Sequence, residues 1–193
     1  MRYQIGPAFR VTLLMTVLTG LIYPGIVTGL CQLIFPRRAN GSFLELNGKI
    51  VGSALIGQNF SKRIYFHPRP SAAGNDGYDA RASNASNYGP TNQKLIDRVK
   101  ADIEKFRNEN PAYHGPIPAD LVTTSASGLD PDLSPASALA QAPRVAEARR
   151  ATLDQVKQLI SVHTRGRQLG FLGEPRVNVL ALNLELDRQF PVR

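Results

Sequence analysis

The sequence predicts one membrane-spanning helix followed by a single soluble domain that mixes α and β structure. Three observations lead to this fold class. Residues 11–35 carry no charged side chain. Beyond them, helical and strand-like patterns are intermixed, which is typical of an α/β or α+β domain. The remaining length suits one compact domain and is too short for two ordinary ones. We therefore expect an N-terminal tail at 1–10, a transmembrane helix at 11–35 and a soluble domain at 36–193.

The apolar segment 11–35 is long enough to cross a bilayer. A hydrocarbon core about 30 Å thick requires roughly 20 apolar residues in a helix. The alternative is a cleaved signal peptide, which has a shorter apolar region of about 7 to 15 residues and a cleavage site of small residues. Here Pro36, Arg37 and Arg38 follow directly. This basic stop favours a retained single-pass anchor.

Basic residues on the two sides of the span bear on its orientation. Arg2, Arg10 and the N-terminal amine precede the span, and Arg37 and Arg38 follow it. Cytoplasmic flanks of membrane helices carry the excess of Lys and Arg. The small difference favours a cytoplasmic N-terminus and a soluble domain on the opposite, periplasmic side.

Small residues within the span indicate that it packs against another helix. Gly25 and Gly29 form a G-x-x-x-G pair, which lets two helix backbones approach closely. Pro24 interrupts the helical hydrogen bonds at mid-membrane, where a neighbouring helix or a threonine hydroxyl compensates for the freed carbonyl. The alternative is that glycine and proline are simply commoner in membrane helices than in soluble ones.

The first element beyond the anchor is predicted to be a β-hairpin. Residues 43–46 and 49–56 flank Asn47 and Gly48, and an Asn-Gly pair supplies the positive φ angles of a two-residue type I′ turn. A long loop rich in Gly, Pro, Asn and Ser then covers 60–90. Disordered loops are poor in aromatic residues, so we expect this loop to pack against the domain or a partner through its tyrosines, Tyr65, Tyr78 and Tyr88.

The middle of the chain is predicted to be mainly helical. Residues 91–108 show apolar residues at helical spacing after a capping Thr91 or Asn92. Residues 121–124 form a short β-type run. Prolines are acceptable at helix starts, so we expect two short helices, at 135–141 and 143–150.

The last elements are a helix and a segment with two interpretations. Thr152 and Gln155 have the spacing of a capping box, which predicts a helix from there to His163. Residues 177–187 mix β-branched and helix-forming residues and fit a strand or a helix. We expect a strand at 177–180 that passes into a short helix.

Composition excludes nucleic acid as a partner. Of the formal net charge of +8, four positive charges belong to arginines beside the span. Nucleic-acid-binding surfaces gather basic residues on one face with interleaved aromatics. The basic residues here are scattered. The closest cluster is interpreted as a solvated helix surface: Arg144, Arg149, Arg150, Arg165 and Arg167. Cys31 lies in the span, so the soluble domain has no disulfide.

No residue pattern predicts a catalytic site. The chain lacks the glycine-rich phosphate loop and the DKTG-like phosphorylation sequence. Its three histidines, His67, His114 and His163, stand far apart, without ligand spacing for a metal. Ser127 lacks the first glycine of a G-x-S-x-G elbow. Three aspartates, Asp120, Asp130 and Asp132, have the positions of caps and turn residues. We expect no catalytic residue, no metal and no cofactor of the chain's own.

Six blocks of sequence, in order, resemble the C subunit of the Kdp potassium-transporting ATPase, the KdpC family. They are GSALIGQNF (52–60), YFHPRPSA (65–72), SNYGPTN (86–92), PADLVTTSASGLDPDLSP (118–135), RVAEAR (144–149) and GEPRVNVLALNLELD (173–187). The resemblance covers nearly the whole chain, and six ordered blocks are far more specific than one short motif.

The resemblance implies an accessory, non-catalytic role in a bacterial inner-membrane complex for potassium uptake. Its partners would be a channel-like subunit that binds potassium, a P-type subunit that hydrolyses ATP and a small stabilising subunit. It also implies a cytoplasmic N-terminus and a periplasmic soluble domain, in agreement with the arginine bias.

Two roles within the complex are implied. As a catalytic chaperone, the subunit would assist assembly and raise the ATP affinity of the ATPase subunit, sharing its ATP. The residues concerned are then Ser127, Gly128 and Gln141, although Ser-Gly turns and helical glutamines are also ordinary surface chemistry. As a structural and gating subunit, it would cover the potassium entrance without contacting nucleotide, and Tyr65, Tyr78 and Tyr88 would contact the partner.

Overall fold

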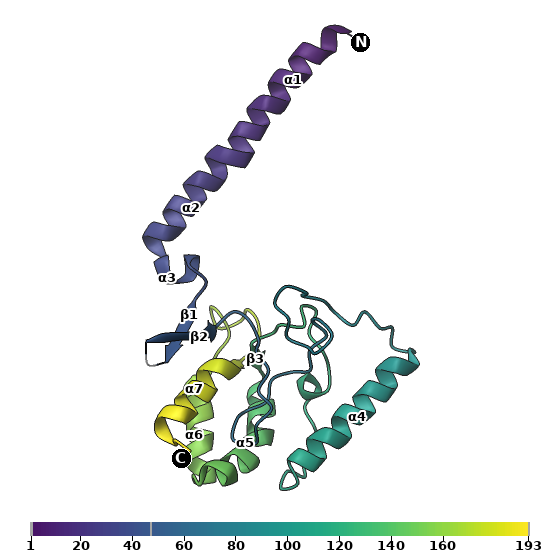
Figure 1. Cartoon of the computed structure of the whole chain (residues 1–193), viewed down its shortest axis with the longest axis vertical. Coiled ribbons are helices and arrows are strands. Elements are labelled where there is room, and N and C mark those ends of the chain that lie inside the picture. Colours follow the sequence, from purple (N-terminus) through teal and green to yellow (C-terminus); the bar gives the residue numbers. More distant parts are fainter. Residues whose placement is uncertain (1, 47, 193) are drawn as a thin grey trace. The chain divides into compact units, whose positions relative to one another are not determined.

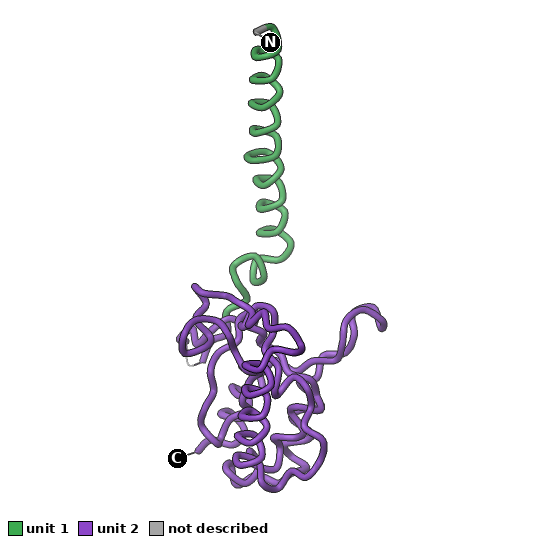
Figure 2. Tube along the Cα trace, turned by 90° about the vertical axis from the view of Figure 1, so that its right-hand side faces the viewer, with its two compact units in different colours: residues 1–43 green, residues 44–193 purple. Residues whose placement is uncertain are grey.

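The structure is a computed structural model that describes residues 2–46 and 48–192. The chain divides into two compact units, residues 1–43 and residues 44–193 (Figure 2).

Unit 1 is a long apolar helix with a short helical extension. The helix comprises α1 (Arg2–Val17), a π-helical turn η1 (Leu18–Ile22) and α2 (Tyr23–Ile34) (Figure 1). Its segment Tyr3–Ile34 is long and apolar enough to cross a membrane. The helix therefore starts nine residues before position 11, where the uncharged segment begins. The single turn α3 (Pro36–Ala39) follows.

The π turn lies immediately before Pro24. Proline has no backbone N–H to donate, so the regular hydrogen-bond pattern fails there. The N–H of Tyr23 donates to the carbonyl of Leu18, five residues back. One turn earlier, the hydroxyl of Thr19 donates to the carbonyl of Met15 at 2.7 Å. The predicted interruption at Pro24 takes the form of this widened turn, which keeps the helix continuous.

Unit 2 contains two small sheets. Strands β1 (Phe43–Leu46) and β2 (Lys49–Ser53) form the first, and β1 begins at the last residue of unit 1. Asn47 of the predicted turn lies outside the described residues, and Gly48 has a φ of +74°. The predicted second strand was too long, because Ser53 begins a turn in which its hydroxyl accepts from the N–H of Leu55.

The second sheet has the strand order β3-β5-β4, with both pairs antiparallel. Its strands are β3 (Asp132–Leu133), β4 (Thr164–Arg165) and β5 (Arg176–Asn178). The segment with two interpretations resolves into β5 followed directly by helix α7 (Val179–Gln189), close to the expected strand and helix. The side chain of Asn178 caps this helix by accepting from the N–H of Ala181.

Helix α4 (Gln93–Glu109) and helix α6 (Leu153–His163) confirm their predictions. Asn92 caps α4, and Thr152 with Gln155 forms the capping box of α6. The prediction of a β-type run at 121–124 was wrong. A 3₁₀ turn, η2 (Ala119–Leu121), stands at its start, and the chain beyond it is irregular.

The prediction of two helices at 135–141 and 143–150 was also wrong. They form one helix, α5 (Pro135–Arg149), with Pro143 in its interior. An interior proline removes one hydrogen bond. Ala138, Ala142 and Val145 lie on either side of that position and are fully buried, so packing on the core outweighs the local loss. Helices α5, α6 and α7 surround this core together with β5.

Candidate functional site

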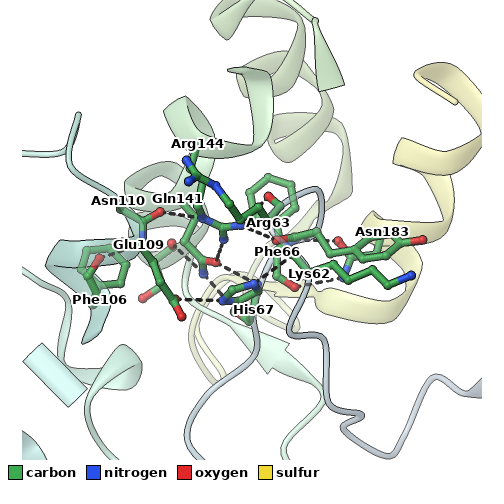
Figure 3. Close-up of polar contacts among 12 residues, drawn as sticks. Lys62, Arg63, Phe66, His67, Phe106, Glu109, Asn110, Gln141, Arg144 and Asn183 are labelled. Carbon is green, nitrogen blue, oxygen red and sulfur yellow. Dashed lines mark hydrogen bonds and ion pairs between the residues drawn. The ribbon is translucent and has the colours of Figure 1, made fainter. Parts of the chain in front are cut away.

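A segment of the long loop, residues 62–67, is held between α5 and α7 by hydrogen bonds to buried side chains (Figure 3). Asn183 of α7 accepts from the N–H of Phe66 at 2.9 Å and donates to its carbonyl at 3.0 Å. Gln141 of α5 does the same for the next residue, His67, at 2.8 and 3.0 Å. Two amide side chains thus replace the sheet partner that this extended backbone lacks.

Arg144 extends this arrangement along the loop. Its guanidinium donates to the carbonyls of Arg63 and Tyr65, at 2.5 and 3.0 Å, and also to the side-chain oxygens of Asn110 and Gln141. The side chain is 2% exposed, and burial lowers the pKa of Arg144 to about 10. Asn110 and Gln141 are buried and the two carbonyls are partly buried, so the guanidinium supplies donors at positions that are largely closed to water.

Arg149, one and a half turns later on α5, holds the neighbouring carbonyl. It donates to Ile64 at 2.8 Å and to Phe190 at 3.1 Å. Its guanidinium forms an ion pair with Asp187 at 2.8 Å and lies 4.8 Å from the ring centre of Tyr65. The Tyr65 hydroxyl in turn donates to Asp187 at 2.9 Å, and burial, then this carboxylate, raise the pKa of Tyr65.

These contacts correct the interpretation of the arginine cluster as solvated helix surface. Arg144 and Arg149 are 2% and 6% exposed, and their guanidinium groups donate hydrogen bonds to backbone carbonyls inside the domain. Arg150, Arg165 and Arg167 are exposed, as expected. Together with Gln141 and Asn183, the two buried arginines bond the carbonyls of all five residues 63–67. We call these four side chains and the segment 62–67 the loop clamp.

His67 connects the loop clamp to the end of α4. Its Nδ1 lies 3.1 Å from the carboxylate of Glu109, and its Nε2 lies 3.1 Å from the carbonyl of Lys62. Burial and the nearby charge of Arg144 lower the pKa of His67, against the opposing effect of Glu109. In the described part of the chain, no group of three or more His, Cys, Asp or Glu residues is placed to hold a metal ion.

A cavity of about 270 Å³ lies beside the loop clamp. Its lining includes charged residues of both signs, among them Arg69, Asp102, Lys105 and Glu109, together with Gln141. Burial raises the pKa of Asp102, while Arg98 and Lys105 oppose that shift. Of the lining residues, Arg69 forms an ion pair at 2.7 Å with Asp130, which connects this part of the loop to the chain before β3.

Ser127 and Gly128 lie in a tight turn whose contacts go elsewhere. The Ser127 carbonyl accepts from the N–H of Asn84 and the hydroxyl of Ser83, and the Gly128 carbonyl accepts from Ser71. Gly128 has a φ of +67°, and a Cβ there would lie 2.8 Å from backbone atoms of the loop. These two residues therefore secure the loop, whereas the contacts of Gln141 are with His67, Ser137 and Arg144. Gln141 is buried, unlike an ordinary surface glutamine of a helix.

The three loop tyrosines have different environments. Tyr65 belongs to the loop clamp. Tyr78 is half-buried, donates its hydroxyl to the carbonyl of Arg69, and has its pKa raised by burial. Tyr88 is 40% exposed. Of the three, Tyr88 therefore presents the most accessible ring to a partner, and the other two order the loop.

The glycine pair of unit 1 forms an open helix face. A Cβ added to Gly25 or Gly29 would meet no described atom within 4 Å. Pro24 is placed in the first turn of α2, directly before Gly25. The backbone is therefore accessible along one side of α2, as a close helix partner requires.

Sequence reasoning missed the loop clamp. One feature of the sequence does indicate it: the polar residues Gln141 and Arg144 extend the apolar face of the helix that carries Ala138 and Val145. Polar residues on a buried face need specific partners, so such a position predicts a polar contact inside the domain.

Comparisons with known proteins identify relatives of the whole chain. A family model described as "K+-transporting ATPase, c chain" matches residues 5–188. A protein of Myxococcus xanthus named potassium-transporting ATPase KdpC subunit is 58% identical over 95% of this chain and 87% of its own length. Proteins of the same name from Koribacter versatilis and Rhodospirillum rubrum are each 55% identical, over 100% and 97% of this chain and 98% and 97% of their own lengths.

Proposed function

Because the chain belongs to the KdpC family, the C subunits of the K+-transporting ATPase, we propose that it is an assembly and gating subunit of that complex. Its span packs beside another membrane helix, and its soluble domain covers the potassium entrance. The partners are the channel-like potassium-binding subunit, the ATP-hydrolysing P-type subunit and the small stabilising subunit.

The observation that carries this proposal is the use of Gln141 inside the domain. Its amide bonds both backbone groups of His67 and also accepts from Arg144. A nucleotide contact at Gln141 would break these buried hydrogen bonds, at about 1–3 kcal/mol for each group left unpaired. The alternative role is a catalytic chaperone that shares ATP through Ser127, Gly128 and Gln141, and it requires the loss of these hydrogen bonds. The structural role leaves them intact.

Assembly through the span is tested by the double substitution Gly25→Leu and Gly29→Leu. Two leucines block close approach of a second backbone, so we expect most of this subunit to be lost from the complex isolated through the ATPase subunit. The matched control is Gly20→Leu, a third open glycine of the same helix outside the pair. Normal stoichiometry with the double variant would contradict the proposal.

The same preparation separates the two roles. Ser127 is exposed, so Ser127→Ala alters the turn without opening the core. An intact Ser127→Ala complex with an unchanged apparent KM for ATP fits the structural role. A raised apparent KM in that complex would favour the chaperone.

We propose a cytoplasmic N-terminus and a periplasmic unit 2, supported by the arginine bias around the span. With Cys31 replaced by alanine, Ala126→Cys should react with an impermeant maleimide on intact cells, because residue 126 is exposed. Tyr3→Cys, eight residues before the uncharged segment 11–35, should react only after lysis. The reverse labelling pattern would overturn this orientation.

A further inference from the structure

Unit 2 carries an exposed apolar hairpin between β4 and β5, residues 164–176, which we call the apolar hairpin. Leu169, Phe171 and Leu172 at its tip are 82%, 69% and 48% exposed. Large apolar side chains occur singly on most protein surfaces, whereas a contiguous group marks an interaction site. The function proposed above does not use this group.

The tip is held in a defined shape. Gln168 and Leu172 exchange two backbone hydrogen bonds of 2.9 Å, and the turn between them places Leu169 and Gly170 at φ of +52° and +84°. Below the tip, Arg167 forms an ion pair with Glu174 at 2.8 Å. The apolar side chains are therefore presented together at the end of a braced hairpin.

The composition of the hairpin changes from its tip to its base. The tip is apolar and aromatic. The base carries Arg165, Arg167 and Arg176, of which Arg167 pairs with Glu174 and Arg176 pairs with Asp132 of β3 at 3.2 Å. Aromatic and aliphatic side chains with arginines behind them suit the boundary between acyl chains and anionic headgroups. A convex tip of three side chains is also far smaller than the surface, about 800 Å² per partner, that a stable protein interface buries.

A short tether limits how far the first strand of unit 2 can lie from the end of the span. Nine residues, 35–43, separate the end of α2 from unit 2, and fully extended they reach about 30 Å at most. In Figure 1 the apolar hairpin, coloured between green and yellow, lies at the same end of unit 2 as β2, where the chain enters. Ile50 and Leu55, from β2 and the turn after it, are exposed as well.

We propose that the apolar hairpin inserts Leu169, Phe171 and Leu172 into the interfacial region of the lipid bilayer on its own side of the membrane. It is thus a second membrane contact, which limits the rotation of unit 2 about its tether. The ligand is a lipid surface, with anionic headgroups against the arginines at the base.

The test places one environment-sensitive aromatic label at Phe171→Cys in the full chain, with Cys31 replaced by alanine. The chain is reconstituted in nanodiscs of phosphatidylethanolamine and phosphatidylglycerol. The matched control is Val162→Cys on α6, which is also 69% exposed. We expect the label at 171 to be quenched severalfold more strongly by nitroxide on lipid chains than the label at 162, and less strongly by aqueous iodide.

Two outcomes would overturn the proposal. Equal iodide quenching at 171 and 162 would place the tip in water. Shielding of 171 from both quenchers that arises only on adding the other subunits would assign the tip to a protein socket. Lipid quenching at 171 in both the lone subunit and the complex would support it.

Discussion

Substitution of Arg144 by methionine is expected to lower the free energy of unfolding of unit 2 by about 3 kcal/mol. Methionine keeps most of the buried volume but supplies no donor. The carbonyls of Arg63 and Tyr65 and the amide oxygen of Asn110 would each lose a hydrogen bond from a charged group. Asn110 is buried and the two carbonyls are partly buried, so water replaces these hydrogen bonds only in part unless the domain opens.

The measurement is urea unfolding of the full chain in detergent, followed by circular dichroism. The control is Arg107→Met, because Arg107 is an exposed arginine of α4. A surface substitution of this kind changes stability by roughly 0.5 kcal/mol or less. Equal midpoints for the two variants would show that the guanidinium of Arg144 contributes no net stability.

Substitution of Asn183 by leucine is expected to destabilise unit 2 by roughly 2–4 kcal/mol. Leucine has a similar shape, but it leaves both backbone groups of Phe66 unpaired in a fully buried position. The loss should release the segment 62–67 as well as reduce stability, because the Asn183 amide bonds both backbone groups of Phe66 to α7.

Two readouts separate these effects. Urea unfolding measures the stability, and the rate of proteolytic cleavage after Lys62 or Arg63 measures release of the loop. Gln158→Leu, at an exposed glutamine of α6, is the control. A variant with lower stability but unchanged cleavage would mean that Asn183 supports the core and not the loop.

The sequence predicts the elements that depend on local signals. The span follows from an uncharged run, the caps of α4 and α6 from Asn92 and Thr152, and the hairpin strands from the residues around Gly48. Each of these signals acts within a few residues, where backbone sterics and local hydrogen bonds decide the outcome.

The errors have a common physical cause. Pro143 predicts a helix start, yet burial on both sides of it keeps α5 continuous. The sequence pattern predicts that Arg144 and Arg149 are solvated, yet their partners are backbone carbonyls about 80 residues away. Carbonyls are present at every residue, so the sequence does not mark which of them an arginine will bond. Tertiary contacts determine the structure at such positions, and a local sequence pattern does not show which tertiary contacts will form.

The loop clamp also sets an order of events in folding. Phe66 is joined to Asn183 across 117 positions, and Tyr65 to Asp187 across 122. Contacts of such separation form late, because a long loop has to close before they yield any stabilisation. During synthesis α7 emerges after every other helix described here. Until it does, the extended segment 62–67 has unpaired backbone groups, so a newly made chain remains open to proteases or chaperones at this segment longest.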